Sequence, residues 1–167
     1  RIVIMGTAGL GDGNVTPVAE FNIWQDAEAA KIVTESGLDN IIFVGWDACL
    51  GDCMLNPKEI KEIRESGKLG KFAIDCNKNL LEMNRGRFGD DYLDMADPSA
   101  MSAALYPECI EKCEKYYCEV DVSAGPSYGA VLVDVNNVTG KEPNVYICSK
   151  LYADKYKEYI YRTLKVK

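Results

Sequence analysis

Two short apolar runs, each followed by a glycine, constrain the fold of this chain more than any other feature. The first is Arg1 to Met5 and the second is Asn40 to Val44. Continuous apolar runs are typical of parallel strands that are buried on both faces. Between them lies AEAAKIVTES, with Asp26 in front as a helix cap and Gly37 behind as a stop. The order strand, helix, strand predicts a right-handed parallel crossover.

The remaining pattern predicts further helices and strands around this unit. Asn56, Pro57 and Glu59 form a helix start, with a cap, a proline at the first position and an acid three residues after the cap. Apolar spacing predicts helices over about 69–86, 97–105 and 152–164, and strands over 116–122, 129–135 and 144–148. We therefore expect an α/β chain with a Rossmann-like, mixed, mostly parallel sheet flanked by helices.

Composition excludes some classes of partner. The 167 residues carry a net charge of −7, with 47% hydrophobic and 27% charged residues, as in ordinary globular domains. Nucleic acids and anionic membranes attract clustered Lys and Arg, so neither is an expected partner. No apolar run approaches the ~18 residues of a membrane span.

The chain has seven cysteines and no histidine. An odd count leaves at least one thiol unpaired within the chain, and the spacing of Cys109, Cys113 and Cys118 matches no zinc motif. We expect buried thiols or structural disulfides. Together with the glycosylation sequon at Asn137, the cysteines slightly favour a secreted protein over a cytoplasmic one.

The segment GNVTPVAEFNIWQ, residues 13–25, concentrates polar groups beside aromatic ones. It places Asn14, Glu20 and Asn22 next to Phe21 and Trp24. An amide both donates and accepts hydrogen bonds and a carboxylate accepts them, which suits the hydroxyls of a ribose. The alternative is a polar loop in which the side chains make only local turn bonds.

Two loops follow the expected strands, where ligands bind in open α/β sheets. The loop GTAGLGDGN lacks the third glycine of the dinucleotide fingerprint, because Asn14 occupies that position. A Rossmann-type dehydrogenase is therefore disfavoured. After the second strand, Trp46 and Asp47 are modest site candidates, and a rim aromatic and a plain loop acid are equally good interpretations.

The string GNVTPVAEFNIW resembles the ribose-binding segment of the inosine–uridine-preferring nucleoside hydrolase family. A second string, ADPSAMSAAL, resembles the segment of that family in which an Asp opens a helix and binds calcium. The resemblance implies that Asn14, Glu20 and Asn22 hold the ribose hydroxyls, that Phe21 shapes the pocket, and that Asp97 binds Ca²⁺. From the residues alone, an ordinary helix cap before Pro98 is the favoured interpretation of Asp97.

The resemblance also implies a reaction, the hydrolysis of an N-glycosidic bond to free base and ribose. One departure concerns the leaving base, since Ala96 stands where pyrimidine-accepting members have His. Three alternatives follow: a purine-leaning enzyme, an acid such as Asp94 in place of the histidine, or a protein that binds nucleosides without cleaving them. The candidates for stacking on a purine base are Phe88, Tyr92 and Trp46.

The resemblance covers only the C-terminal half of the family's domain. The resemblance implies that the N-terminal half supplies most calcium ligands and the general base, and that half has no counterpart here. The chain opens directly with a strand. We expect residues 1–167 to be the C-terminal part of one domain, inactive alone, completed by the N-terminal half as a separate chain or segment. Family members commonly form homo-oligomers. The alternative function is a catalytically inactive binding or structural protein.

Overall fold

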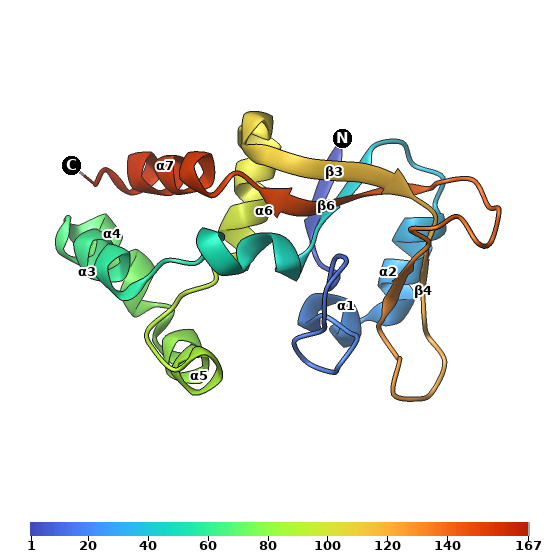
Figure 1. Cartoon of the computed structure of the whole chain (residues 1–167), viewed down its shortest axis with the longest axis horizontal. Coiled ribbons are helices and arrows are strands. Elements are labelled where there is room, and N and C mark those ends of the chain that lie inside the picture. Colours follow the sequence, from blue (N-terminus) through green and yellow to red (C-terminus); the bar gives the residue numbers. More distant parts are fainter. Residues whose placement is uncertain (167) are drawn as a thin grey trace.

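The computed structural model describes residues 1–166, and a four-stranded sheet lies at its centre (Figure 1). The strands follow the order β1-β2-β6-β3, with the first three parallel and the last antiparallel. They are β1 (Ile2–Met5), β2 (Ile41–Val44), β6 (Val145–Leu151) and β3 (Ile110–Tyr116). The expected mixed, mostly parallel α/β sheet is confirmed.

Both faces of this sheet are covered, which explains the continuous apolar runs. Side chains alternate between faces along a strand, so Ile41 and Phe43 join one core and Val44 joins the other. The first core is covered by α1 (Phe21–Gln25), α2 (Ala27–Glu35) and a small sheet of β4 (Cys118–Val120) and β5 (Val131–Val133). The second is covered by α6 (Ala96–Leu105) and α7 (Ala153–Leu164), and α3 (Pro57–Glu65) extends this core beyond the sheet.

The prediction of one long helix over 69–86 is wrong. The segment forms α4 (Lys68–Asp75) and α5 (Lys78–Phe88), which lie beyond the sheet with α3 (Figure 1). The break falls at Asn77, whose side-chain amide donates to the carbonyl of Ala73 at 2.8 Å and whose ψ of 16° leaves the helical range. Asn competes with the helical backbone in this way, while the apolar spacing continues across the break.

The expected strand over 116–122 is also wrong in part. Its residues are divided between the end of β3 and β4, which belong to different sheets, and the rest of β3 was not predicted. The β3 sequence IEKCEKY is mostly charged because this strand lies at the sheet edge, where charged residues are common. The other two expected strands correspond to β5 and β6, with shifted ends.

Asp47 joins the loop after β1 to the end of β2. It lies in the 3₁₀ helix η1 (Trp46–Cys49), and its Oδ2 accepts from the amide of Leu10 at 2.9 Å. A methyl group on Gly9 or Gly45 would collide with this carboxylate, and Gly9 has a φ of +74°. Its Oδ1 is buried and has no hydrogen-bond partner among the described residues. Burial raises the pKa of the Asp47 carboxyl to about 6, because the charged form is poorly solvated there.

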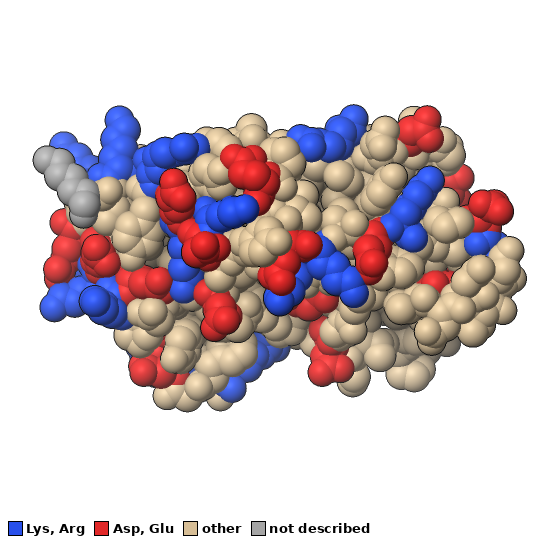
Figure 2. Space-filling view, turned by 45° about the horizontal axis from the view of Figure 1, so that its top comes forward, with Lys and Arg blue, Asp and Glu red and all other residues tan. Residues whose placement is uncertain are grey.

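The surface carries both signs of charge. On the face in Figure 2, Lys and Arg are interspersed with Asp and Glu. Several of the exposed charges are paired, for example Lys31 with Glu35 on α2 and Lys150 with Glu111 between β6 and β3. Within residues 1–166, no helix is long and apolar enough to cross a bilayer.

The start of α3 offers a test of local stability. Asn56 Oδ1 accepts from the amides of Lys58 and Glu59 at 3.0 Å, and the Glu59 carboxylate accepts from the amide of Asn56 at 2.9 Å. Asn56→Ala should lower the free energy of unfolding by about 1 kcal/mol in urea titrations, because the helix loses its cap. Asn79→Ala, an exposed position inside α5, should have little effect. Equal losses in both variants would contradict the capping role.

The Asp47 carboxyl predicts a pH dependence. Its folded pKa of about 6 lies above the ordinary value of 3.8, so the folded state binds the proton more tightly. The contribution of Asp47 to stability should therefore be greatest below about pH 4 and be lost as the pH rises through 6, by about 1–3 kcal/mol. Urea titrations between these pH values should show this loss diminished in Asp47→Asn. The control Asp52→Asn, at an exposed neighbour, should retain it.

Candidate functional site

The two motifs singled out in the sequence meet at one hollow. It lies at the carboxyl ends of β1 and β2, has a volume of about 260 Å³, and opens between α1, the start of α6 and the first turn of α5. It is lined by Met5, Asn14, Glu20, Phe21, Asn22, Trp46, Asn77, Leu80, Asp94, Met95, Ala96, Asp97 and Pro98. Residues 14–22 and 94–98 are far apart in sequence, and they meet because α6 packs against β1 and Trp46 donates to Asp94.

Glu20 is nearly fully buried, with 2% of its surface exposed. It caps α1, since its two carboxylate oxygens accept from the amides of Asn22 at 2.9 Å and Ile23 at 3.2 Å. Burial raises the pKa of Glu20, as does the like charge of Asp97, while the backbone amides oppose the shift. Each oxygen can accept a further hydrogen bond, so the cap leaves capacity for a ligand.

Asn14 and Asn22 present complementary groups. The Asn14 Oδ1 accepts from the amide of Phe21 at 2.8 Å, which leaves its NH₂ group as the donor for a ligand. The Asn22 amide nitrogen lies 3.0 Å from the sulfur of Met5 and 3.4 Å from its carbonyl, which leaves Oδ1 as an acceptor. One donor and two kinds of acceptor therefore face the hollow beside the exposed ring of Phe21.

Asp94 is held on both sides by neighbours. Its Oδ2 accepts from the indole nitrogen of Trp46 at 2.8 Å and its Oδ1 accepts from the Asn84 amide at 2.5 Å. The same Asn84 nitrogen donates to the carbonyl of Tyr92 at 3.1 Å. Asp94 lines the hollow, but both of its oxygens already accept hydrogen bonds, so its first role is to join η1 to α5.

Of the three candidates for stacking on a base, Trp46 lines the hollow. The Arg87 guanidinium lies 5.0 Å from the centre of the Trp46 ring. Arg87 also donates to the carbonyl of Asn14 at 3.2 Å. Phe88 and Tyr92, the two other candidates, are not among the lining residues. No local sequence signal marks Asn84 or Arg87, because only the packing of α5 brings Asn84 to Asp94 and Arg87 to Trp46.

Asp97 is exposed in the first turn of α6. The helix begins at Ala96 with Met95 as its cap residue, so the interpretation of Asp97 as an ordinary helix cap is wrong. No hydrogen bond or ion pair engages its carboxylate within residues 1–166, and nowhere in that range do three or more His, Cys, Asp or Glu side chains gather as for a metal. Asp97 thus offers a free oxygen ligand, and a complete calcium shell needs others.

Asp47, the other candidate after β2, lies outside this hollow. It borders a separate depression with Asp52, Glu111 and Lys150, and its carboxylate faces the glycine loop instead. The sequence placed it on the correct side of the sheet, but η1 turns it away from Asn14 and Asn22.

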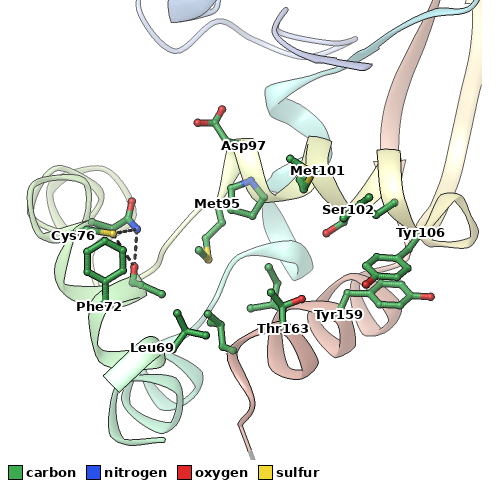
Figure 3. Close-up of a pocket in the computed structure, with 16 residues that line it drawn as sticks. Leu69, Phe72, Cys76, Met95, Asp97, Met101, Ser102, Tyr106, Tyr159 and Thr163 are labelled. Carbon is green, nitrogen blue, oxygen red and sulfur yellow. Dashed lines mark hydrogen bonds between the residues drawn. The ribbon is translucent and has the colours of Figure 1, made fainter. Parts of the chain in front are cut away.

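An apolar groove adjoins the hollow and shares four lining residues with it, Asn77, Met95, Asp97 and Pro98 (Figure 3). Its volume is about 520 Å³, and it runs between α4, α6 and α7. The exposed side chains of Leu69, Phe72, Met101 and Leu105 border it. At its far end, the rings of Tyr106 and Tyr159 stack with centroids 3.8 Å apart.

Known proteins resemble this chain in both sequence and fold. A relative from Shigella boydii, named a putative pyrimidine-specific ribonucleoside hydrolase, is 34% identical over 88% of this chain and 60% of its own length. A purine-preferring ribonucleoside hydrolase from Gardnerella vaginalis superposes with a TM-score of 0.82 at 27% identity, over 99% of this chain and 52% of that one. A plant nucleoside hydrolase shares the fold, with a TM-score of 0.87 at 24% identity, over 99% and 54%.

The chain therefore spans between about half and three fifths of the length of these relatives. The family model of the inosine-uridine preferring nucleoside hydrolases matches residues 1–158. That match includes both strand ends, the segment with Asn14, Glu20 and Asn22, and the segment with Asp97. The chain belongs to the inosine–uridine preferring nucleoside hydrolase family.

Proposed function

We propose that the protein containing this chain hydrolyses the N-glycosidic bond of ribonucleosides, releasing free base and ribose. The observation that carries the proposal is the convergence of Asn14, Glu20, Asn22 and Asp97 around one hollow at the carboxyl ends of β1 and β2. Family membership supports the same reaction. The hollow is small and polar on one side, as a ribose requires.

The residues of this chain bind and orient the sugar. The Asn14 NH₂ group donates to a ribose hydroxyl, and Asn22 Oδ1 and the Glu20 carboxylate accept from hydroxyls. Holding the ring in this way removes orientational freedom before bond cleavage. As the glycosidic bond breaks, positive charge develops on the sugar, and the nearby carboxylates of Glu20 and Asp97 stabilise it.

Calcium is the proposed cofactor, with Asp97 as its ligand in this chain. The fit rests on the unengaged, exposed carboxylate of Asp97 and on the like charge that it places near the buried Glu20. A cation there would relieve that repulsion. When bound, the metal would hold sugar hydroxyls and a water molecule for attack. Because calcium takes about six to eight oxygen ligands, Asp97 can supply only part of the shell.

We further propose that another segment completes the site, supplying the remaining carboxylates and the general base. Two features of the structure support this proposal. Within the described residues, β1 pairs only with β2 and leaves its other edge open for a further strand. The apolar groove runs directly into the hollow at Asp97, so a segment covering the groove would also reach the site. The greater length of the relatives agrees with this.

A purine preference is the finer part of the proposal. Ala96 lines the hollow where the resemblance implies a base-assisting histidine, and the chain contains no histidine. Trp46 offers an aromatic wall for a larger base. The names of the relatives support either class, because one is called pyrimidine-specific and another purine-preferring.

A nucleoside assay on the native protein tests the function. The protein should be isolated with an antibody against this chain, its intact mass and N-terminal sequence determined, and its products from inosine, guanosine, uridine and cytidine separated with calcium present. We expect a companion segment rich in aspartate and release of base and ribose, faster from the purine nucleosides. Faster pyrimidine release would overturn only the preference. No release from any nucleoside would support the alternative, a catalytically inactive binding or structural protein.

Two substitutions in the native protein separate the metal from the sugar. Asp97→Asn should weaken calcium binding about 10–100-fold in calorimetry, since bonds to a charged group contribute about 1.5–3 kcal/mol. Asn22→Ala should weaken nucleoside binding about 5–10-fold and leave calcium affinity unchanged. Asp39→Asn, at a remote exposed acid, serves as the control. Unchanged calcium affinity in Asp97→Asn would refute the ligand assignment.

A further inference from the structure

Two of the seven free cysteines face each other across neighbouring strands. Cys113 lies in β3 and Cys148 in β6, and the antiparallel register pairs them directly. The two strands lie side by side in Figure 1, with β3 at the edge of the sheet. Both side chains point to the same face, since Cys148 belongs to the core under α6 and α7 and Cys113 packs against that core.

The register alone brings these residues within bridging distance. Directly opposed residues of antiparallel strands have Cα atoms about 4.5–5.5 Å apart. Disulfides span Cα separations of about 4.4–6.8 Å. A bond between Cys113 and Cys148 therefore requires rotation of the side chains and no separation of the strands.

The environments of the two thiols suit Cys113 to attack an oxidant and Cys148 to complete the disulfide. Cys113 is half-buried at the sheet edge, whereas Cys148 is fully buried. The neighbouring Cys148 thiol lowers the pKa of the Cys113 thiol. By contrast, burial raises the pKa of Cys118 to about 12 and that of Cys109 to about 11. Only thiolates attack disulfides, so Cys113 is the reactive member of the pair.

We propose that Cys113 and Cys148 form an intramolecular cross-strand disulfide when the protein meets a small-molecule disulfide. The Cys113 thiolate attacks one sulfur of the oxidant, forming a mixed disulfide and releasing one thiolate. Cys148 then attacks the Cys113 sulfur and gives its proton to the departing thiolate, so the second half of the oxidant leaves as a thiol. The two protein thiols are oxidised and one oxidant disulfide is reduced to two thiols. The bond would fasten the edge strand β3 to β6, independently of the proposed nucleosidase function.

Peptide mapping tests this proposal. The experiment uses the folded chain carrying Cys76→Ser, since Cys76 is the exposed thiol and would form bonds between molecules. The chain is incubated with oxidised glutathione, alkylated under denaturing conditions and digested with trypsin. We expect the fragment 113–115 joined to the fragment 142–150, each of which contains a single cysteine. The intact mass should fall by two hydrogen atoms, without retained glutathione.

Matched variants identify the pair. Cys113→Ser should abolish the linked fragments and the loss of hydrogen, whereas Cys109→Ser, which removes the buried thiol near Cys148, should retain both. Should either variant fail to fold, the peptide map of the chain carrying only Cys76→Ser still shows which two cysteines are linked. Two outcomes would overturn the proposal: alkylation of all remaining thiols after oxidation, or a bond from Cys148 to Cys109 in place of Cys113.

Discussion

The parallel pairing of β1 with β2 is the constraint on which the rest of this structure depends. It places the carboxyl ends of both strands at the same edge, so the glycine-rich loop and η1 emerge side by side. The amide of Trp46 donates to the carbonyl of Thr7 at 2.9 Å, and Asp47 accepts from Leu10. These contacts fix the loop that leads to Asn14, and Gly9 and Gly45 leave the space that they require.

Glu20 shows how one residue can serve both the fold and the site. As the cap of α1 it satisfies two amides that begin a helix of only five residues. The same contacts hold its carboxylate at the hollow in one orientation, and burial beside Asp97 makes the charged form less favourable there. Such a carboxylate would be stabilised by a cation or by the hydroxyls of a bound sugar, which connects the local geometry to the proposed reaction.

The face of the sheet under α6 and α7 differs from the opposite face in how it is covered. There α4, α6 and α7 leave an apolar groove that continues into the candidate site, whereas α2 and the small sheet close the first face more fully. Apolar side chains such as Phe72 and Met101 gain stability only when another surface covers them. The groove, the open edge of β1 and the single acid at Asp97 support the same proposal, that the catalytic unit includes more polypeptide than this chain.

The sequence by itself determined the α/β class, the β1–α2–β2 unit, the capping box at Asn56 and the family. These features depend on local signals: continuous apolar runs, cap and stop residues, and two strings of matching residues. Local signals failed where a side chain competes with the backbone, as at Asn77, and where a strand is charged because it lies at an edge, as in β3.

The tertiary structure alone decided which polar residues share a hollow. It brought Asn14 and Asp97 to one place, turned Asp47 away and left Phe88 and Tyr92 outside. Behind the hollow, it set Asn84 against Asp94 and Arg87 over Trp46. It also set Cys113 against Cys148, which are 35 positions apart in the sequence. Distances between elements depend on how helices pack and how strands register, and short-range sequence patterns do not encode either quantity directly.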